Sequence, residues 1–164
     1  MFGKRTFRIS LIMAVITVLF GGTLFAAQHN ELQFPIDVTG FSTQDLSQIQ
    51  IIVNGRTVQS DVDPVSRDGH LLIPLRAVFS ALGAEVHWFE DPRTVAMVDQ
   101  EKEIRIIIQL NNNVAYGNRK HWNFEMHPIL HGDRTMVMPE VIALGYEVDV
   151  EWNKDTKQLR INTN

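Results

Sequence analysis

The chain has 164 residues and no cysteine, which excludes disulfide bonds, thiol nucleophiles and zinc–thiolate sites. Its length suits one domain with an N-terminal leader. Three of its 15 lysines and arginines, and none of its 19 acidic residues, precede residue 28, so the rest carries a net charge of −7. An acidic surface without a basic stripe does not capture phosphate backbones, and we expect no nucleic-acid partner.

Residues 1–27 have the pattern of a secretory leader. Three basic residues precede an apolar run over 9–27, and this order is typical of signal peptides. Cleavage after Ala27 would place Phe25 at the −3 position, where small residues are preferred. The run is also close to the roughly 20 residues that span a bilayer. A cleaved signal peptide and an uncleaved membrane anchor therefore stay as alternatives. Both predict a secreted or cell-surface protein that touches a membrane only through this segment.

The following segment, 28–48, is polar and interrupted by proline and glycine, which predicts a linker. At residue 49 the composition changes to an apolar run that ends at Asn54-Gly55. This pattern predicts a β-hairpin, because Asn and Gly accept the left-handed conformations of a two-residue turn. We therefore place the folded domain at 49–164.

Residues 71–88, LLIPLRAVFSALGAEVHW, predict a strand, a short helix and a second strand. Pro74 suits the start of the helix, and Gly83 suits the position just past its end. Val86 and Trp88 alternate with polar residues, which is the period of a strand with one buried face. The helix prediction rests on four apolar residues that share one helix face, namely Leu75, Val78, Phe79 and Leu82.

A displacement of 64 residues brings the second part of the sequence into register with the first, so that Trp152 coincides with Trp88. Internal self-similarity of this kind indicates a duplicated unit, with repeats at about 49–110 and 111–164. We therefore predict an α+β fold, an antiparallel sheet with two short helices. Two homologous strand–helix–strand halves build it around one core, and the N-terminal signal or anchor helix precedes it.

Three stretches carry a resemblance to a known family: VNGRTV at 53–58, LLIPLRAVFSALGAEVHW at 71–88 and DRTMVMPEVIALGYEVDVEWNKDTKQLRI at 133–161. Their order resembles that of the copper amine oxidase N-terminal domain-like family, also called stalk domains. The family pattern is an NG hairpin, a PLR helix that ends in ALGA, a VxW strand and a D-x-x-T turn, given twice. The resemblance implies an exported protein of Gram-positive bacteria. The second copy departs from the pattern because it lacks the Pro-Leu-Arg run after Val137.

The resemblance also implies a non-catalytic role. In copper amine oxidases this domain is an accessory stalk, and the copper and the quinone cofactor lie in a separate catalytic part. That part needs a tyrosine between asparagine and an acidic residue, and a His-x-His pair. Here Tyr116 lies in Ala-Tyr-Gly, Tyr146 lies in Gly-Tyr-Glu, and no His-x-His occurs. We therefore expect no enzyme activity and no cofactor.

Three histidines suggest a metal site. His121, His127 and His131 lie within eleven residues, and imidazole is a common ligand of copper and zinc. Pro128 and Gly132 interrupt this stretch, which favours a loop in which helical spacing cannot aim two rings at one ion. Metal ligands and scattered loop histidines stay as the two interpretations.

Trp122 and Arg76 are the candidate ligand-binding residues. Trp88 is in phase with buried strand positions and is expected in the core, whereas Trp122 has polar neighbours and is expected to be exposed to carbohydrate or peptide. Arg76 lies off the apolar helix face. An arginine in this place either binds a ligand carboxylate or phosphate bidentately or pairs with an acidic residue such as Asp91 or Glu85.

These features predict a non-catalytic exported accessory module at the bacterial cell surface, which binds a cell-wall polysaccharide or another surface protein. A purely structural stalk or assembly element is the first alternative, and a copper-binding or amine-oxidase-related protein is the second. A groove lined by Trp122 and polar groups would favour ligand binding. A large exposed apolar patch or edge strand would favour assembly.

Overall fold

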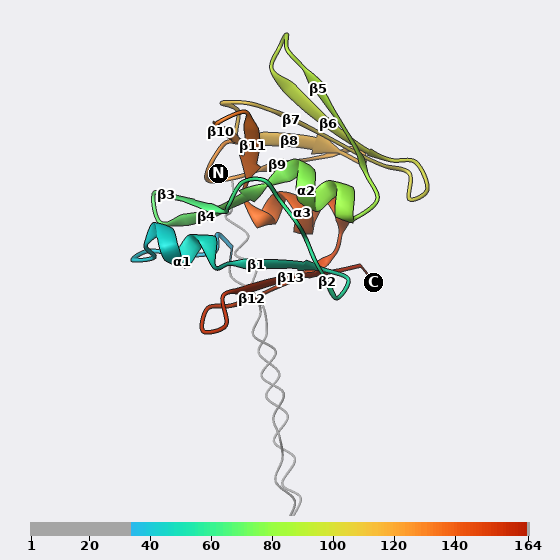
Figure 1. Ribbon diagram of the computed structural model, residues 1–164. Coiled ribbons are helices and arrows are strands. Elements are labelled where there is room, and N and C mark those ends of the chain that lie inside the picture. The colour runs from blue at the N-terminus through green and yellow to red at the C-terminus, as the bar shows by residue number, and fades with distance from the viewer. Residues whose placement is uncertain (1–33, 164) are drawn as a thin grey trace, which may run out of the picture. The chain divides into compact units, whose positions relative to one another are not determined.

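The computed structural model describes residues 34–163 (Figure 1). The described residues form three short helices and thirteen strands, and antiparallel pairing prevails among these strands. The predicted α+β class is confirmed. The predicted signal or anchor helix at 1–27 lies outside the described residues. Within 34–163, each helix is too short or too polar to cross a membrane.

The strands form three sheets, whereas one sheet was predicted. Sheet I contains, in spatial order, β12 (Asp149–Asn153), β13 (Gln158–Asn162), β1 (Gln50–Val53) and β2 (Arg56–Thr57). Sheet II contains β10 (Ile129–His131), β11 (Arg134–Val137), β4 (His70–Pro74) and β3 (Val65–Arg67). Sheet III contains β5 (Glu85–Phe89), β6 (Thr94–Asp99), β7 (Ile104–Gln109), β8 (Val114–Gly117) and β9 (Lys120–Asn123). In sheet I, β1 pairs with β13 in parallel, which joins the beginning of the domain to its end.

Two helices follow strands of sheet II directly. Helix α2 (Leu75–Ala81) begins after Pro74, and α3 (Pro139–Tyr146) begins with its own proline. Proline suits the start of a helix because the first N–H groups have no partner within the helix. Backbone of positive φ follows each helix, at Gly83 with 97° and at Glu147 with 53°. The predicted helix and its glycine stop are thereby confirmed.

Helices α2 and α3 lie between sheets I and III (Figure 1). Helix α2 contacts β1 of sheet I and β5 of sheet III, and α3 contacts β12 and β7 of the same two sheets. Phe79 and Ile142 are fully buried at these contacts. The ring of Phe79 also meets the edge of the Tyr146 ring, with centroids 5.6 Å apart. The two helices therefore fill the core that both sheets share.

Gly145 allows α3 to pack closely on β7. A β-carbon at this position would collide with Cδ1 of Ile106, a side chain that is itself fully buried. The side chain of Ile106 occupies the space that any larger residue would need. Close packing of this kind leaves little room for added volume.

Residues 34–48 belong to the folded domain, so the predicted linker at 28–48 is wrong over this part. Ile36 and Val38 are 2% and 1% exposed. Their backbone bonds β4 and the turn before it, since the N–H of Leu71 donates to the carbonyl of Ile36 and the N–H of Val38 donates to the carbonyl of Gly69. Helix α1 (Thr43–Ser47) follows, and a capping box of Ser42 with a helical aspartate starts it. In the sequence, only Ile36 and Val38 alternate with polar residues here, and so short an alternation does not predict that the segment packs into the core.

Among residues 34–163, one charged side chain is buried in the core. Asp99, at the end of β6, is 4% exposed and accepts hydrogen bonds from Lys102 Nζ at 2.7 Å and from the Tyr146 hydroxyl at 3.2 Å. Lys102 Nζ also donates to the carbonyl of Leu82 at the end of α2. Burial opposes the charge of Asp99, but the bonds from Lys102 and Tyr146 outweigh it and lower the pKa of the carboxyl. Burial and the Asp99 charge raise the pKa of Tyr146. The cluster joins α2, α3 and sheet III.

The order strand pair, helix, strand pair occurs twice along the described chain, first as β3–β4–α2–β5–β6 and then as β10–β11–α3–β12–β13. The two stretches meet in sheet II, where β4 pairs with β11. Trp88 on β5 and Trp152 on β12 both pack half-buried against the core. The homology of the two halves, with boundaries at 49–110 and 111–164, stays a prediction.

Candidate functional site

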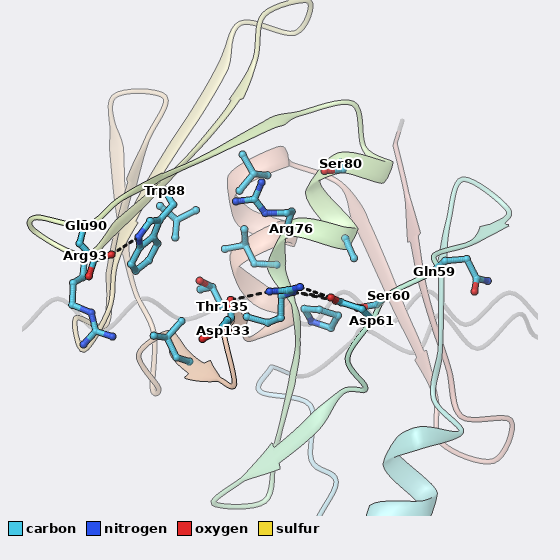
Figure 2. Close-up of a pocket in the computed structure, with 17 residues that line it drawn as sticks. Gln59, Ser60, Asp61, Arg76, Ser80, Trp88, Glu90, Arg93, Asp133 and Thr135 are labelled. Atoms are coloured by element: carbon cyan, nitrogen blue, oxygen red, sulfur yellow. Dashed lines mark hydrogen bonds and ion pairs between the residues drawn. The ribbon is translucent and has the colours of Figure 1, made fainter.

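A groove of about 760 Å³ opens beside the N-terminal half of α2. The β5–β6 hairpin, the β10–β11 hairpin and the loop after β2 form its other walls (Figure 2). The groove is lined by Gln59, Ser60, Asp61, Pro74, Leu75, Arg76, Ala77, Ser80, Val86, Trp88, Glu90, Arg93, Val95, Leu130, Asp133, Arg134 and Thr135. The walls come from four separate parts of the chain, so the site exists only in the folded domain.

Trp88 forms the aromatic wall of the groove. It lies on β5 opposite Val95 of β6, which is 2% exposed, and the indole packs half-buried against the core. The indole Nε1 donates a hydrogen bond to Oε2 of Glu90 at 2.8 Å (Figure 2). Packing and this hydrogen bond together fix the orientation of the ring, while its remaining surface lines the groove.

Arg76 lies on α2 next to Leu75, which is buried. Its own side chain is exposed, as the helix pattern predicts. It extends into the groove on the side that faces Trp88 (Figure 2). Among the described residues, no carboxylate lies within ion-pair distance of it, and Glu85 lies instead 3.3 Å from His87. The predicted alternative, an ion pair of Arg76 with Asp91 or Glu85, is therefore not present in the structure.

An ion pair ties two walls of the groove together. Arg134 of β11 donates from Nε to Oδ2 of Asp61 at 2.9 Å, and its terminal nitrogen bonds the same carboxylate (Figure 2). The hydrogen bonds lower the pKa of the Asp61 carboxyl and raise the pKa of Arg134. The two residues stand 73 positions apart in sequence, so no local pattern could pair them, and the sequence analysis missed both.

The charges of the groove are balanced but unevenly placed. Three arginines and three carboxylates line it. Arg134 is neutralised by Asp61. Glu90 and Arg93 lie together in the β5–β6 turn, where the N–H of Arg93 donates to the carbonyl of Glu90. Figure 2 shows Trp88 between this turn and Arg76. The groove thus presents a cation on one side of the indole and a mixed pair on the other.

A comparison with protein families decides the classification. The model of the family described as copper amine oxidase N-terminal domain matches residues 52–161. The chain belongs to this family. The resemblance found in the sequence is confirmed, and the matched region is the N-terminal, non-catalytic domain of copper amine oxidase-like proteins. Comparisons with curated proteins and with solved structures give no match.

The described histidines of this copper amine oxidase N-terminal domain are not gathered into a metal site. His121 lies on β9, His127 lies in the following loop and His131 lies on β10. Within residues 34–163, no three His, Cys, Asp or Glu side chains converge as metal ligands. The predicted metal set of His121, His127 and His131 is therefore corrected. Strand β9 directs His121 to the outer face of sheet III beside Tyr116, whereas β10 belongs to sheet II.

Trp122 does not line the groove. It lies on β9 opposite Ala115, which is 1% exposed, and the indole packs half-buried against the core. Its ring also covers Gly117, where a β-carbon would stand 3.2 Å from Cζ3 of the indole. The alternation of β9 is that of a strand with one inward face, and Trp122 occupies the inward side. The aromatic residue of the groove is Trp88, which the sequence analysis placed only in the core.

Proposed function

We propose that this chain is a non-catalytic binding module of the bacterial cell surface, exported by its leader, and that its ligand is a cell-wall glycan. The observation that carries the proposal is the groove in which an oriented indole, Trp88, stands beside Arg76, an arginine that forms no ion pair with the described carboxylates. An aromatic wall with a few convergent polar groups is typical of a small-ligand site.

The size of the groove favours a glycan over a folded protein. Ligand pockets commonly enclose about 300–1,000 Å³, and this groove of about 760 Å³ lies within that range. A stable protein interface buries roughly 800 Å² on each partner and needs a broad surface rather than a groove. A sugar chain presents flat faces of C–H groups, which stack on an indole, and a rim of hydroxyl groups, which bond polar side chains.

Preorganisation supports binding at Trp88. Immobilising a side chain at an interface costs free energy, but Glu90 already holds the indole nitrogen at 2.8 Å. Arg76 is carried by a helix whose inner face, with Val78 and Phe79, is fully buried. Both candidate contacts therefore stand on fixed backbone elements, and the indole is already oriented, so ordering of the Arg76 side chain is the main conformational cost left for the ligand.

The described lining of the groove is not that of a histidine-dependent hydrolase or of a histidine-ligated metal centre. Histidine is absent from its described lining, so the usual general base is not in place. The match to the non-catalytic domain of the family agrees with this. We propose an accessory role in which the module holds its chain, or a partner joined to it, on the cell wall.

Co-sedimentation with purified bacterial cell walls tests the proposal. The full chain, kept soluble by mild detergent, is expected to sediment with walls, and Trp88→Ala is expected to stay in the supernatant. Trp122→Ala is the matched control, because it also removes a half-buried indole of sheet III but lies outside the groove. Cell fractionation is expected to recover the chain outside the cytoplasm. Equal sedimentation of wild type and Trp88→Ala would contradict the proposed site and leave a structural stalk as the function.

A further inference from the structure

We infer that the groove selects a sugar that carries one carboxylate next to the ring stacked on Trp88, and that Arg76 binds this carboxylate. The inference rests on the proposed function and names the chemistry of its ligand. The charges around Trp88 favour an acidic sugar over a neutral sugar and over a polyanion.

Arg76 is the cation available to a ligand on the α2 side of Trp88. The charge of Arg134 is already committed to the bidentate bond with Asp61. Arg93 lies beyond the indole, in the same turn as Glu90 (Figure 2). The guanidinium of Arg76 has no described carboxylate within 4.0 Å. A guanidinium and a carboxylate can form two parallel hydrogen bonds. A ligand carboxylate would therefore provide the ion-pair partner that Arg76 lacks among the described residues.

The surroundings of Arg76 strengthen such a pair. Leu75, Val86 and Val95 line the groove near the helix and the inner face of the β5–β6 hairpin. A ligand on this surface displaces water, and a charge pair gains strength as the local dielectric constant falls. The planar fork also gives direction, so a ring attached to the carboxylate is held against the indole.

The far side of Trp88 disfavours a second carboxylate. Glu90 lies there together with Arg93, so this pair adds no net positive charge, and Asp133 lines the groove from the β10–β11 turn (Figure 2). The chain beyond its leader carries a net charge of −7. Like charges at close range repel and reduce affinity. The same carboxylates accept hydrogen bonds from hydroxyl groups, so the neutral part of a sugar chain suits this side. The geometry therefore favours one carboxylate per bound segment over a polyanion.

Calorimetric titration of the full chain in mild detergent with two matched probes tests the inference. The first probe is a disaccharide of glucuronic acid and N-acetylglucosamine, which carries one carboxylate, and the second is its methyl ester, in which a methyl group neutralises that carboxylate. Wild type is expected to bind the acid about tenfold more tightly than the ester, because a hydrogen bond to a charged group contributes this much. Arg76→Gln is expected to remove this difference, because it weakens the binding of the acid and leaves the binding of the ester unchanged.

Three further variants define the site. Arg76→Lys is expected to keep part of the preference, because it retains the charge without the fork. Arg105→Gln is the matched control, since it removes an exposed arginine of β7 that does not line the groove. It is expected to bind both probes as wild type does. Trp88→Ala is expected to weaken the acid and the ester equally.

The outcomes separate this inference from the proposed function. Equal binding of acid and ester by wild type, with both lost in Trp88→Ala, would overturn the carboxylate preference and leave a glycan-binding groove. Tighter binding of oligogalacturonate or of a glutamate peptide, again dependent on Arg76, would overturn the single-carboxylate sugar in favour of a polyanion. Absence of binding by wild type to both probes and to cell walls would overturn both proposals.

Discussion

Lys102→Met provides a sharp test of the buried charge that joins α2, α3 and sheet III. The substitution keeps most of the unbranched apolar stem of the side chain but removes the ammonium that donates to Asp99 at 2.7 Å and to the carbonyl of Leu82 at 3.0 Å. Asp99 then keeps the Tyr146 hydroxyl and the N–H of residue 102 as donors. A carboxylate that is 4% exposed is thereby left without a cation.

The size of the effect follows from burial. Removing one partner of a buried ion pair costs about 3–5 kcal/mol. The Lys102 side chain is 42% exposed, so water replaces part of the lost interaction, and we expect a loss of about 2–3 kcal/mol in the free energy of unfolding. For a domain of this size the midpoint of thermal unfolding falls by about 5–10 °C.

The pH dependence distinguishes a lost charge pair from a general packing defect. In wild type the pKa of Asp99 is lower in the folded state than in the unfolded state. This contribution is therefore present above the unfolded pKa of about 3.9 and is lost as the pH falls through the folded value. Without Lys102, burial raises the folded pKa instead. Protonation then stabilises the variant, so its deficit shrinks as the pH is lowered from about 7 to about 4.5.

Urea unfolding followed by tryptophan fluorescence, at both pH values, measures this deficit. Lys120→Met is the matched control, because Lys120 also pairs with a carboxylate, Glu147, at 2.8 Å, but both side chains are exposed. It is expected to lose much less stability, since exposed pairs are screened by water and salt. A Lys102→Met deficit that is equal at both pH values would refute the role of Lys102 in neutralising Asp99.

Two further substitutions probe the core around α3. Tyr146→Phe keeps the ring against Phe79 but removes the donor to Asp99, and we expect a loss of about 1–2 kcal/mol. Wild type should also lose stability above about pH 10, where the unfolded tyrosine ionises first, and this loss should be reduced in the variant. Gly145→Ala gains helix propensity of up to about 1 kcal/mol but collides with Ile106. A net loss of about 1–2 kcal/mol is expected, and Ile106→Val in the same chain should restore part of it. Unfolding curves that show no loss in Gly145→Ala would contradict the close packing of α3 on β7.

Short-range features of the fold could be predicted from the sequence. The spacing of Leu75, Val78 and Phe79 identified α2, and the Asn54-Gly55 turn between β1 and β2 has the positive φ angles that its residue types favour. Such features depend on periodicity and turn chemistry within a few residues. The exposure of Arg76 was predictable for the same reason, since its place on the helix follows from that of its neighbours.

Of the two residues that carry the candidate site, Arg76 was predicted from the sequence and Trp88 was not. Trp88 was predicted as a core residue, and it does pack against the core, but sequence periodicity does not show that the free part of a half-buried ring borders a groove. Trp122, which has similar polar neighbours and was predicted to be exposed, faces inward instead. Which face of a strand is covered depends on the element that packs there, and that element is distant in sequence.

Residues that are neighbours along the chain are enough to specify the local elements, the copper amine oxidase N-terminal domain family and the position of Arg76 on its helix. Tertiary structure alone decided the parallel pairing of β1 with β13, the contact of Asp61 with Arg134 and the burial of Asp99. These features form only when segments that are far apart in the sequence pack together. The groove, whose walls come from four such segments, is a product of that packing.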